Sequence, residues 1–279
     1  MQRYKFLHTF KLRADNFPKK IRNIAPKVAK FLRLGKKKER ISFVLLSTLR
    51  NFAQTNDKST MKVIDLSDSN SVLNKYMSEL RNVDIQKERM RFRQNIVRIG
   101  HVEAYEISKF LSYSQKTIQT PLDECEVNTY DDDIVVGTVF RAGLPLHQAF
   151  LDIFDEAGNA FVSAYRYYKD REMNEVGIKV EYCASPALDG KTLILVDPML
   201  ATGGSLELAF EALKSKGTPQ RLVMACVIAA QSGIEYLQKI FPSDDVVLVC
   251  GAIDPILNEH KYIVPGLGDA GDLMYGEKI

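Results

Sequence analysis

The stretch Lys191-Thr-Leu-Ile-Leu-Val-Asp-Pro-Met-Leu-Ala-Thr-Gly-Gly-Ser205 decides the fold of this chain. Its first six residues end in the continuous apolar run Leu193-Ile-Leu-Val196, which is typical of a strand that is buried on both faces. After it, residues 205–216 place apolar side chains at helical spacing and end at Gly217, which predicts an amphipathic helix. The stretch therefore predicts a buried strand, a glycine-containing loop and a helix, in that order.

The same alternation extends on both sides of this unit through residues 61–279 of the 279-residue chain. Buried strands that alternate with helices form a mostly parallel sheet with helices on its faces, and such sheets bind ligands beyond the carboxyl ends of their strands. We therefore predict an α/β fold. The expected strands are 61–66, 133–140, 159–168, 178–183, 191–196, 221–230 and 246–252, and the expected helices are 71–82, 84–115 (capped by Asp84), 144–155, 205–216 and 234–241.

The loop after the strand at 191–196 has the chemistry of an anion site. The first amides of a helix have no intrahelical partner and attract anions, and Gly203 and Gly204 allow a phosphate to approach the backbone. Thr202 and Ser205 add hydroxyl donors. The carboxylate of Asp197 would repel phosphate and suits ribose hydroxyls or the shell of a magnesium ion. The glycines alone are equally consistent with an ordinary turn, because short glycine patterns are weak signals.

The first 60 residues differ in charge from the rest of the chain. They hold 16 Lys and Arg against three Asp and Glu, a balance of +13, whereas residues 61–279 hold 22 against 32, a balance of −10. Three interpretations stay open: a basic tail that touches nucleic acid or an anionic surface, a transit peptide, or a segment upstream of a true start at Met61. We prefer the third, which leaves residues 61–279 as the functional domain.

Composition narrows the class of protein. No apolar run approaches the ~18 residues that a membrane-spanning helix needs, so we expect no membrane association. The four cysteines and four histidines are scattered, which predicts free thiols in a reducing cytoplasm and no zinc site.

Four segments, in the same order, resemble uracil phosphoribosyltransferases. They are Arg141-Ala-Gly-Leu144, Tyr165–Arg171, the loop Asp-Pro-Met-Leu-Ala-Thr-Gly-Gly-Ser at 197–205, and Gly266-Leu-Gly-Asp-Ala-Gly-Asp272. Most type I phosphoribosyltransferases have two adjacent acids where this chain has Asp197-Pro198, and the Asp-Pro form is typical of the uracil enzymes. The resemblance covers about Met61 to Asp272 and does not include residues 1–60.

The resemblance implies a type I phosphoribosyltransferase fold, with a central mostly parallel sheet, flanking helices and a small C-terminal hood. It implies transfer of the 5-phosphoribosyl group of PRPP to N1 of uracil, giving UMP and pyrophosphate. Mg²⁺ would be held mainly through the pyrophosphate, with no dedicated protein ligand. A homodimer or larger oligomer is implied, and a GTP activator is left open.

The resemblance also assigns site residues. An arginine at position 141 can hold pyrophosphate oxygens with its planar fork. The full implied set for PRPP is Arg141, Arg166, Asp197, Pro198, Met199, Leu200, Ala201, Thr202, Gly203, Gly204, Ser205 and Asp269, and for uracil it is Ile263, Gly268, Asp269 and Ala270. The polar tip near 171–175 is expected to cover the site as a flap.

Two other functions share this fold. One is a pyrimidine-sensing regulator that binds RNA, and the other is a degenerate paralogue that binds UMP without turnover. The acidic balance of residues 61–279 argues against RNA binding, because RNA favours a basic face. The intact loops argue against the paralogue.

We predict that deleting residues 1–60 leaves the activity intact, because the charge pattern and the family resemblance both change at Met61. The measurement is solubility and turnover of the 61–279 fragment beside the full chain. An insoluble or inactive fragment would contradict the domain assignment.

Overall fold

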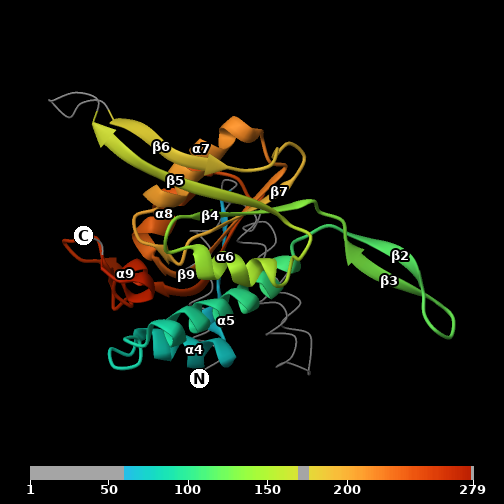
Figure 1. Ribbon diagram of the computed structural model, residues 1–279, viewed down its shortest axis with the longest axis horizontal. Coiled ribbons are helices and arrows are strands. Elements are labelled where there is room, and N and C mark those ends of the chain that lie inside the picture. The colour runs from blue at the N-terminus through green and yellow to red at the C-terminus, as the bar shows by residue number, and fades with distance from the viewer. Residues whose placement is uncertain (1–59, 169–175, 278–279) are drawn as a thin grey trace, which may run out of the picture. The chain divides into compact units, whose positions relative to one another are not determined.

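A mostly parallel sheet lies at the centre of the described structure (Figure 1). The computed structural model describes residues 60–168 and 176–277, so residues 1–59 and the expected flap at 171–175 lie outside the described residues. The strand order is β1-β10-β9-β7-β4-β5-β6, with β8 added beside β9, and β5 and β6 are the antiparallel pair. The strands are β1 (Lys62–Asp65), β4 (Ile134–Val139), β5 (Gly158–Tyr168), β6 (Val176–Ala184), β7 (Thr192–Val196), β8 (Met199–Leu200), β9 (Arg221–Ala230) and β10 (Val246–Asp254).

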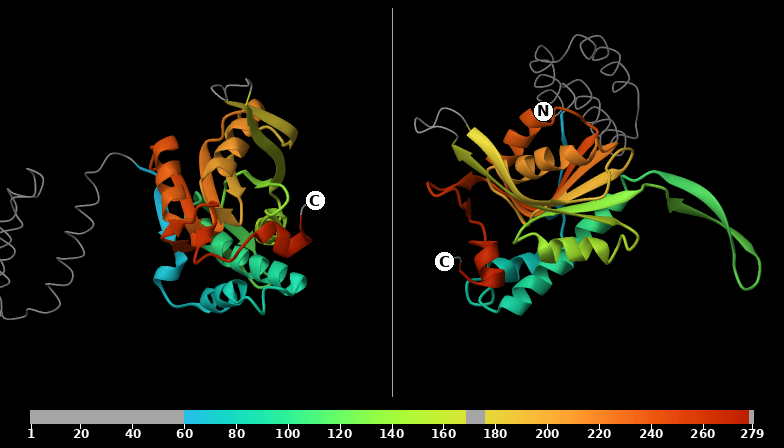
Figure 2. Two further views of the ribbon diagram at one scale, coloured as in Figure 1. Left: turned by 90° about the vertical axis from the view of Figure 1, so that its left-hand side faces the viewer. Right: turned by 45° about the horizontal axis from the view of Figure 1, so that its top comes forward.

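Helices cover both faces of this sheet (Figures 1 and 2). Successive side chains of a strand point to opposite faces, and β7 follows this rule. Ile194 and Val196 pack with α4 (Val72–Arg81), α5 (Arg89–Ser108) and α6 (Leu144–Leu151), whereas Leu193 and Leu195 pack with α7 (Gly204–Leu213) and α8 (Gln231–Ile240). The α/β prediction is therefore confirmed.

The helix expected over residues 84–115 is present as α5, but its expected bounds were too wide at both ends. Asn82, not Asp84, caps the turn that precedes α5, because its side-chain oxygen accepts from the amides of residues 84 and 85. The helix begins at Arg89, after Glu88, and ends at Ser108. The expected helix starts at 205 and 234 were also late, by one and three residues.

Beyond α5 the chain forms an antiparallel hairpin, β2 (Tyr113–Gln119) and β3 (Glu124–Tyr130), which projects from the rest of the described chain (Figures 1 and 2). Every residue of β2 is exposed, so no buried face imposed an alternating apolar pattern on the sequence. The tight turn is closed by Thr120, whose amide donates to the carbonyl of Asp123 and whose hydroxyl accepts from the Asp123 amide.

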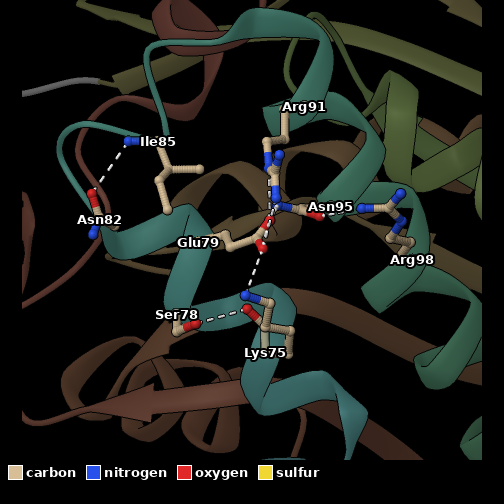
Figure 3. Close-up of polar contacts among 8 residues, drawn as sticks. All are labelled: Lys75, Ser78, Glu79, Asn82, Ile85, Arg91, Asn95 and Arg98. Carbon is tan, nitrogen blue, oxygen red and sulfur yellow. Dashed lines mark hydrogen bonds and ion pairs between the residues drawn. The ribbon is translucent and has the colours of Figure 1, made fainter.

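A buried carboxylate ties α4 to α5 (Figure 3). Glu79 accepts from Arg91 at 2.9 and 3.0 Å, from Asn95 at 2.9 Å, and pairs with Lys75 at 3.1 Å. Asn95 in turn accepts from Arg98 at 2.9 Å. The hydrogen bonds from Arg91 above all, then from Asn95 and Lys75, hold the pKa of Glu79 far below its usual value. The charge is thus well compensated, and the helix pair is fixed in one geometry.

A second carboxyl in α5 has the opposite environment. Glu103 is fully buried, close to Gly251 of β10, and neither of its oxygens has a partner at hydrogen-bonding geometry. Burial raises the pKa of Glu103 well above its usual value, and the Gly251 amide offsets only part of this effect. Desolvation disfavours the charged form, so Glu103 holds a proton in the folded protein at a pH where the unfolded chain has lost it.

We predict that Glu103→Gln changes the pH dependence of stability. Between the ordinary and the raised pKa, the folded state binds one more proton than the unfolded state, so the free energy of unfolding of the wild type falls as pH rises. The neutral amide removes this contribution. The stability of the variant relative to wild type should therefore increase from pH 5 to pH 8, measured by urea unfolding. Parallel pH curves for the two proteins would contradict this assignment.

Candidate functional site

A cavity of about 250 Å³ opens at the carboxyl ends of β4 and β7. These strands are parallel neighbours, with Thr138 opposite Val196, so the loops that follow them leave the sheet side by side. A segment near the C-terminus completes the wall. The cavity is lined by Val139, Phe140, Arg141, Ala142, Asp197, Met199, Ser205, Asp269, Ala270 and Gly271.

The loop after β7 is held from two sides. Met199 and Leu200 form the short strand β8 beside β9, although the sequence predicted an irregular loop there. Helix α8 packs closely against the rest of the loop: a side chain at Gly233 would collide with the carbonyl of Ala201, so only a glycine fits there. The loop is therefore held against β9 on one side and α8 on the other.

The start of α7 has the form of an anion site. Its N-cap, Gly203, has a left-handed φ of 87° and supplies no side-chain cap. The Gly204 amide donates to the Thr202 hydroxyl in a long contact of 3.4 Å. The first N–H groups of the helix are therefore available to an anion, and the positive end of the helix dipole favours negative charge at the same place.

Asp197 supplies a carboxyl group at the edge of the cavity. It is 8% exposed, and its oxygen accepts a hydrogen bond of 3.3 Å from the Met199 amide. Burial raises the pKa of Asp197 to about 7, and the Met199 amide opposes that shift. A ligand that brings hydroxyl donors or a cation would favour the ionised form.

Arg141 faces the cavity from the turn between β4 and α6. Its guanidinium makes long contacts with the C-terminal segment: 3.4 Å to the Asp272 carboxylate and 3.5 Å to the Gly276 carbonyl. The guanidinium carbon lies 6.0 Å from the centre of the Tyr275 ring. Since the side chain is exposed and these contacts are long, the guanidinium can exchange them for phosphate oxygens at small cost.

The C-terminal segment forms the expected hood. A short antiparallel pair, β11 (Ile256–Leu257) and β12 (Ile263–Val264), leads through a turn into α9 (Ala270–Tyr275). This helix was not among the elements expected from the sequence. Asp269 caps α9 by accepting from the Asp272 amide at 2.9 Å, and this cap outweighs the glycine that follows.

The structure brings six residues of the expected set to the cavity: Arg141, Asp197, Met199, Ser205, Asp269 and Ala270. The others of the 197–205 loop lie in the same turn without lining the cavity, and Leu200 is buried in the core. Ile263 is also buried, whereas Gly268 is exposed. Arg166 lies on β5 opposite Ile178, and its side chain is outside the described part of the chain.

Four lining residues were missed by the sequence reading: Val139, Phe140, Ala142 and Gly271. Each lies within two positions of an expected residue, so the available signal was proximity in the sequence. The ring of Phe140 stacks on Phe161 at 5.5 Å. Within the described ranges, no group of three His, Cys, Asp or Glu side chains could hold a metal ion, and no helix is long and apolar enough to cross a membrane.

Known proteins resemble this chain in sequence and in fold. Residues 67–277 match the family model for uracil phosphoribosyltransferase. The chain is 52% identical over 219 residues to uracil phosphoribosyltransferase of Porphyromonas gingivalis, covering 78% of this chain and 100% of that protein. It is 35% identical over 226 residues to that of Thermococcus sibiricus, covering 80% and 94%. The solved structure of the AQ2163 protein from Aquifex aeolicus is similar with a TM-score of 0.65 and 28% identity, over 78% of this chain and 99% of that chain.

The sheet order, the strand–Asp–loop–helix unit and the cavity beyond the strand ends define a type I phosphoribosyltransferase fold. The match over residues 67–277 and the identity to the relatives are more specific than the fold. This chain belongs to the uracil phosphoribosyltransferase family, which confirms the resemblance inferred from the sequence.

We predict that Gly203→Ala destabilises the protein more than Gly190→Ala does. Both glycines have left-handed φ angles, 87° and 74°, so each alanine should cost about 1–2 kcal/mol of backbone strain. At Gly203 the new Cβ would also lie 2.7 Å from Cδ1 of Tyr236, whereas nothing lies within 4 Å at Gly190. Overpacking should add about 1–3 kcal/mol. Urea unfolding of both variants measures the difference in the free energy of unfolding. Equal losses of stability would contradict the prediction, because they would mean that the Tyr236 ring moves aside at no cost.

Proposed function

We propose that this protein catalyses the reaction of uracil with PRPP to give UMP and pyrophosphate. The observation that carries the proposal is that Arg141, Asp197, Ser205 and Asp269, from three separate segments, line one cavity at the strand ends. Family membership supports the choice of uracil as the base.

In this reaction a bond forms between N1 of uracil and the anomeric carbon of PRPP, while the bond from that carbon to pyrophosphate breaks. The N1 proton is lost, and no covalent bond to the protein is needed. The tasks of the protein are then positioning the reactants and stabilising charge as it develops.

We assign the ends of PRPP by charge and geometry. The 5-phosphate suits the loop at residues 201–205, where the N-cap Gly203 supplies no side-chain cap to the first amides of α7. The ribose hydroxyls suit the carboxylate of Asp197. The departing pyrophosphate suits Arg141, with Arg166 as a second cation on the basis of family resemblance, because charge-assisted bonds to phosphate are the strong ones. Pro198, Met199 and Leu200 hold the loop on β9.

Mg²⁺ fits this donor set as a companion of PRPP. Bound to the pyrophosphate, it would spread the charge of the leaving group. The chain offers Asp197 and Asp269 near the cavity, and the raised pKa of Asp197, caused by burial, indicates a carboxyl that a cation would help to ionise.

We assign the base to the hood, at Ile263, Gly268, Asp269 and Ala270. Uracil presents two carbonyl acceptors and an N3–H donor, which a rigid stretch of backbone can match. Cytosine presents an amino group in place of one carbonyl and an acceptor at N3. The mismatch would leave buried groups unpaired and should give discrimination of about 10⁴.

We further propose that the protein acts in the cytoplasm as a homodimer or larger oligomer. The four free cysteines support a reducing compartment. The projecting β2–β3 hairpin supports self-association, because it exposes Tyr113, Ile118 and Leu122 together on one arm.

The direct test is pyrophosphate release by the purified full chain with uracil, PRPP and Mg²⁺, with UMP identified as the second product. Omitting uracil and replacing it by cytosine are the controls. The function is wrong if no uracil-dependent pyrophosphate is released, or if cytosine serves equally well.

We predict that Arg141→Ala and Gly268→Val separate the two substrates. Loss of a charge-assisted contact typically costs about 1.5–3 kcal/mol, so Arg141→Ala should raise the KM for PRPP roughly 10- to 150-fold. Gly268 has a φ of 90°, which a β-branched residue cannot adopt without strain, so Gly268→Val should shift the base loop and abolish uracil use.

The two variants control for each other. Gly268→Val should retain the thermal stabilisation by PRPP with Mg²⁺, since a ligand that binds the folded state raises stability by mass action. Arg141→Ala should lose most of that stabilisation. If Arg141→Ala changes only the uracil KM, or if Gly268→Val keeps full turnover, the assignment of that residue is overturned.

A further inference from the structure

An arginine and an aspartate outside the cavity hold the turn of the hood. Arg81, the last residue of α4, donates to both oxygens of Asp254 at 2.8 Å each, and Asp254 is the last residue of β10. The Asp254 side chain is 6% exposed and the Arg81 side chain 25%, so the carboxylate is almost fully removed from water and the guanidinium is partly buried. A bidentate pair of this kind fixes geometry as well as charge.

Both members of the pair also bind the backbone of Gly266. The Gly266 amide donates to Asp254 at 2.7 Å, and the Gly266 carbonyl accepts from Arg81 at 3.0 Å. The same two side chains thus satisfy the donor and the acceptor of one peptide residue. Gly266 has a φ of 64°, and any side chain there would collide with the carbonyl of Ile263, so the turn is as tight as the backbone allows.

The held residue lies directly before the proposed base contacts. Leu267 is buried in the core, and Gly268, Asp269 and Ala270 follow. With Gly266 fixed by two side chains and Leu267 fixed by packing, the amides and carbonyls of the next three residues have little freedom to move. Neither Arg81 nor Asp254 lines the cavity, so any influence on catalysis has to pass through the turn.

We propose that Arg81 and Asp254 are positioning residues for base recognition: they set the place of the Gly268–Ala270 backbone that selects uracil. The proposal rests on the proposed function and adds two residues that no family motif in the sequence singled out. It makes the last residue of α4 a determinant of base use, although no residue of that helix lines the cavity.

The chain offers a matched control. Arg91 also makes a bidentate, partly buried pair with a glutamate of α4, Glu79, at 2.9 and 3.0 Å (Figure 3). This pair joins α4 to α5, and its hydrogen bonds in the described structure do not involve the hood. Arg91→Met and Arg81→Met therefore remove the same kind of interaction from the same helix. They differ in whether the turn at Gly266 is released, and also in the partners that remain: Glu79 keeps Asn95 and Lys75 in Arg91→Met, whereas Asp254 keeps the Gly266 amide in Arg81→Met.

The experiment compares steady-state kinetics of the full chain as wild type, Arg81→Met, Arg81→Lys and Arg91→Met. Misplacement of a binding group by about 1 Å can cost on the order of 10²-fold, so kcat/KM for uracil should fall by about that factor in Arg81→Met. The KM for PRPP should change much less, because Asp269 is the one residue of the displaced stretch that is also assigned to PRPP. Arg81→Lys should be intermediate, because an ammonium keeps the charge but cannot reproduce the fork. Arg91→Met should match wild type in both constants.

A second readout does not depend on turnover. Hydrogen exchange of the peptide spanning residues 256–274, without substrates, should be faster in Arg81→Met than in wild type and unchanged in Arg91→Met. If Arg81→Met does not fold, Arg81→Lys gives the same comparison with a smaller expected effect.

The outcomes separate the two proposals. A wild type that forms no UMP overturns the proposed function, and the role in base use falls with it. A wild type that forms UMP, with unchanged uracil constants in Arg81→Met and Arg81→Lys, overturns the positioning role alone. Equal losses in Arg81→Met and Arg91→Met also overturn it, because they would reflect general loosening of α4. Faster exchange with a selective uracil defect supports it.

Discussion

The parallel pairing of β4 with β7 is the constraint on which the site depends. The register that sets Thr138 opposite Val196 makes both strands end at the same edge of the sheet. Arg141 follows one strand and Asp197 follows the other, so a cation and a carboxyl reach one cavity from segments more than 50 residues apart in the chain. Neither loop could form this cavity alone, because each supplies only one wall.

Three buried carboxyl groups show how the surroundings of a side chain determine whether it is ionised in the folded protein. Glu79 accepts from Arg91, Asn95 and Lys75, so its charge is compensated and joins two helices. Glu103 has no partner at hydrogen-bonding geometry, so burial favours its neutral form. Asp197 lies between these extremes, with one backbone donor and an open cavity beside it. Only the last is placed to change its state when a ligand arrives.

Much of this structure could be predicted from the sequence, because the signals were local. Continuous apolar runs indicated β7, β9 and β10 as strands of a covered parallel sheet, and the segment at 197–205 had the composition of an anion loop before a helix. Family resemblance then assigned Arg141 and Asp269 to the same site. The boundaries were less accurate where the deciding contact was a cap, as at Asn82 and Asp269, since one side-chain hydrogen bond moves a helix end without changing the apolar pattern.

The sequence by itself determined the type and order of the long strands of the central sheet and of the helices that cover it, and the family of the chain, because hydrophobic period and loop composition are properties of short segments. The tertiary structure alone decided the rest. It showed that residues 113–130 form a projecting hairpin, that burial raises the pKa of Asp197, and that Arg81 and Asp254 hold Gly266. Arg81 and Gly266 are 185 residues apart. No local pattern encodes such a contact, because it exists only once the sheet has brought the end of β10 beside the end of α4.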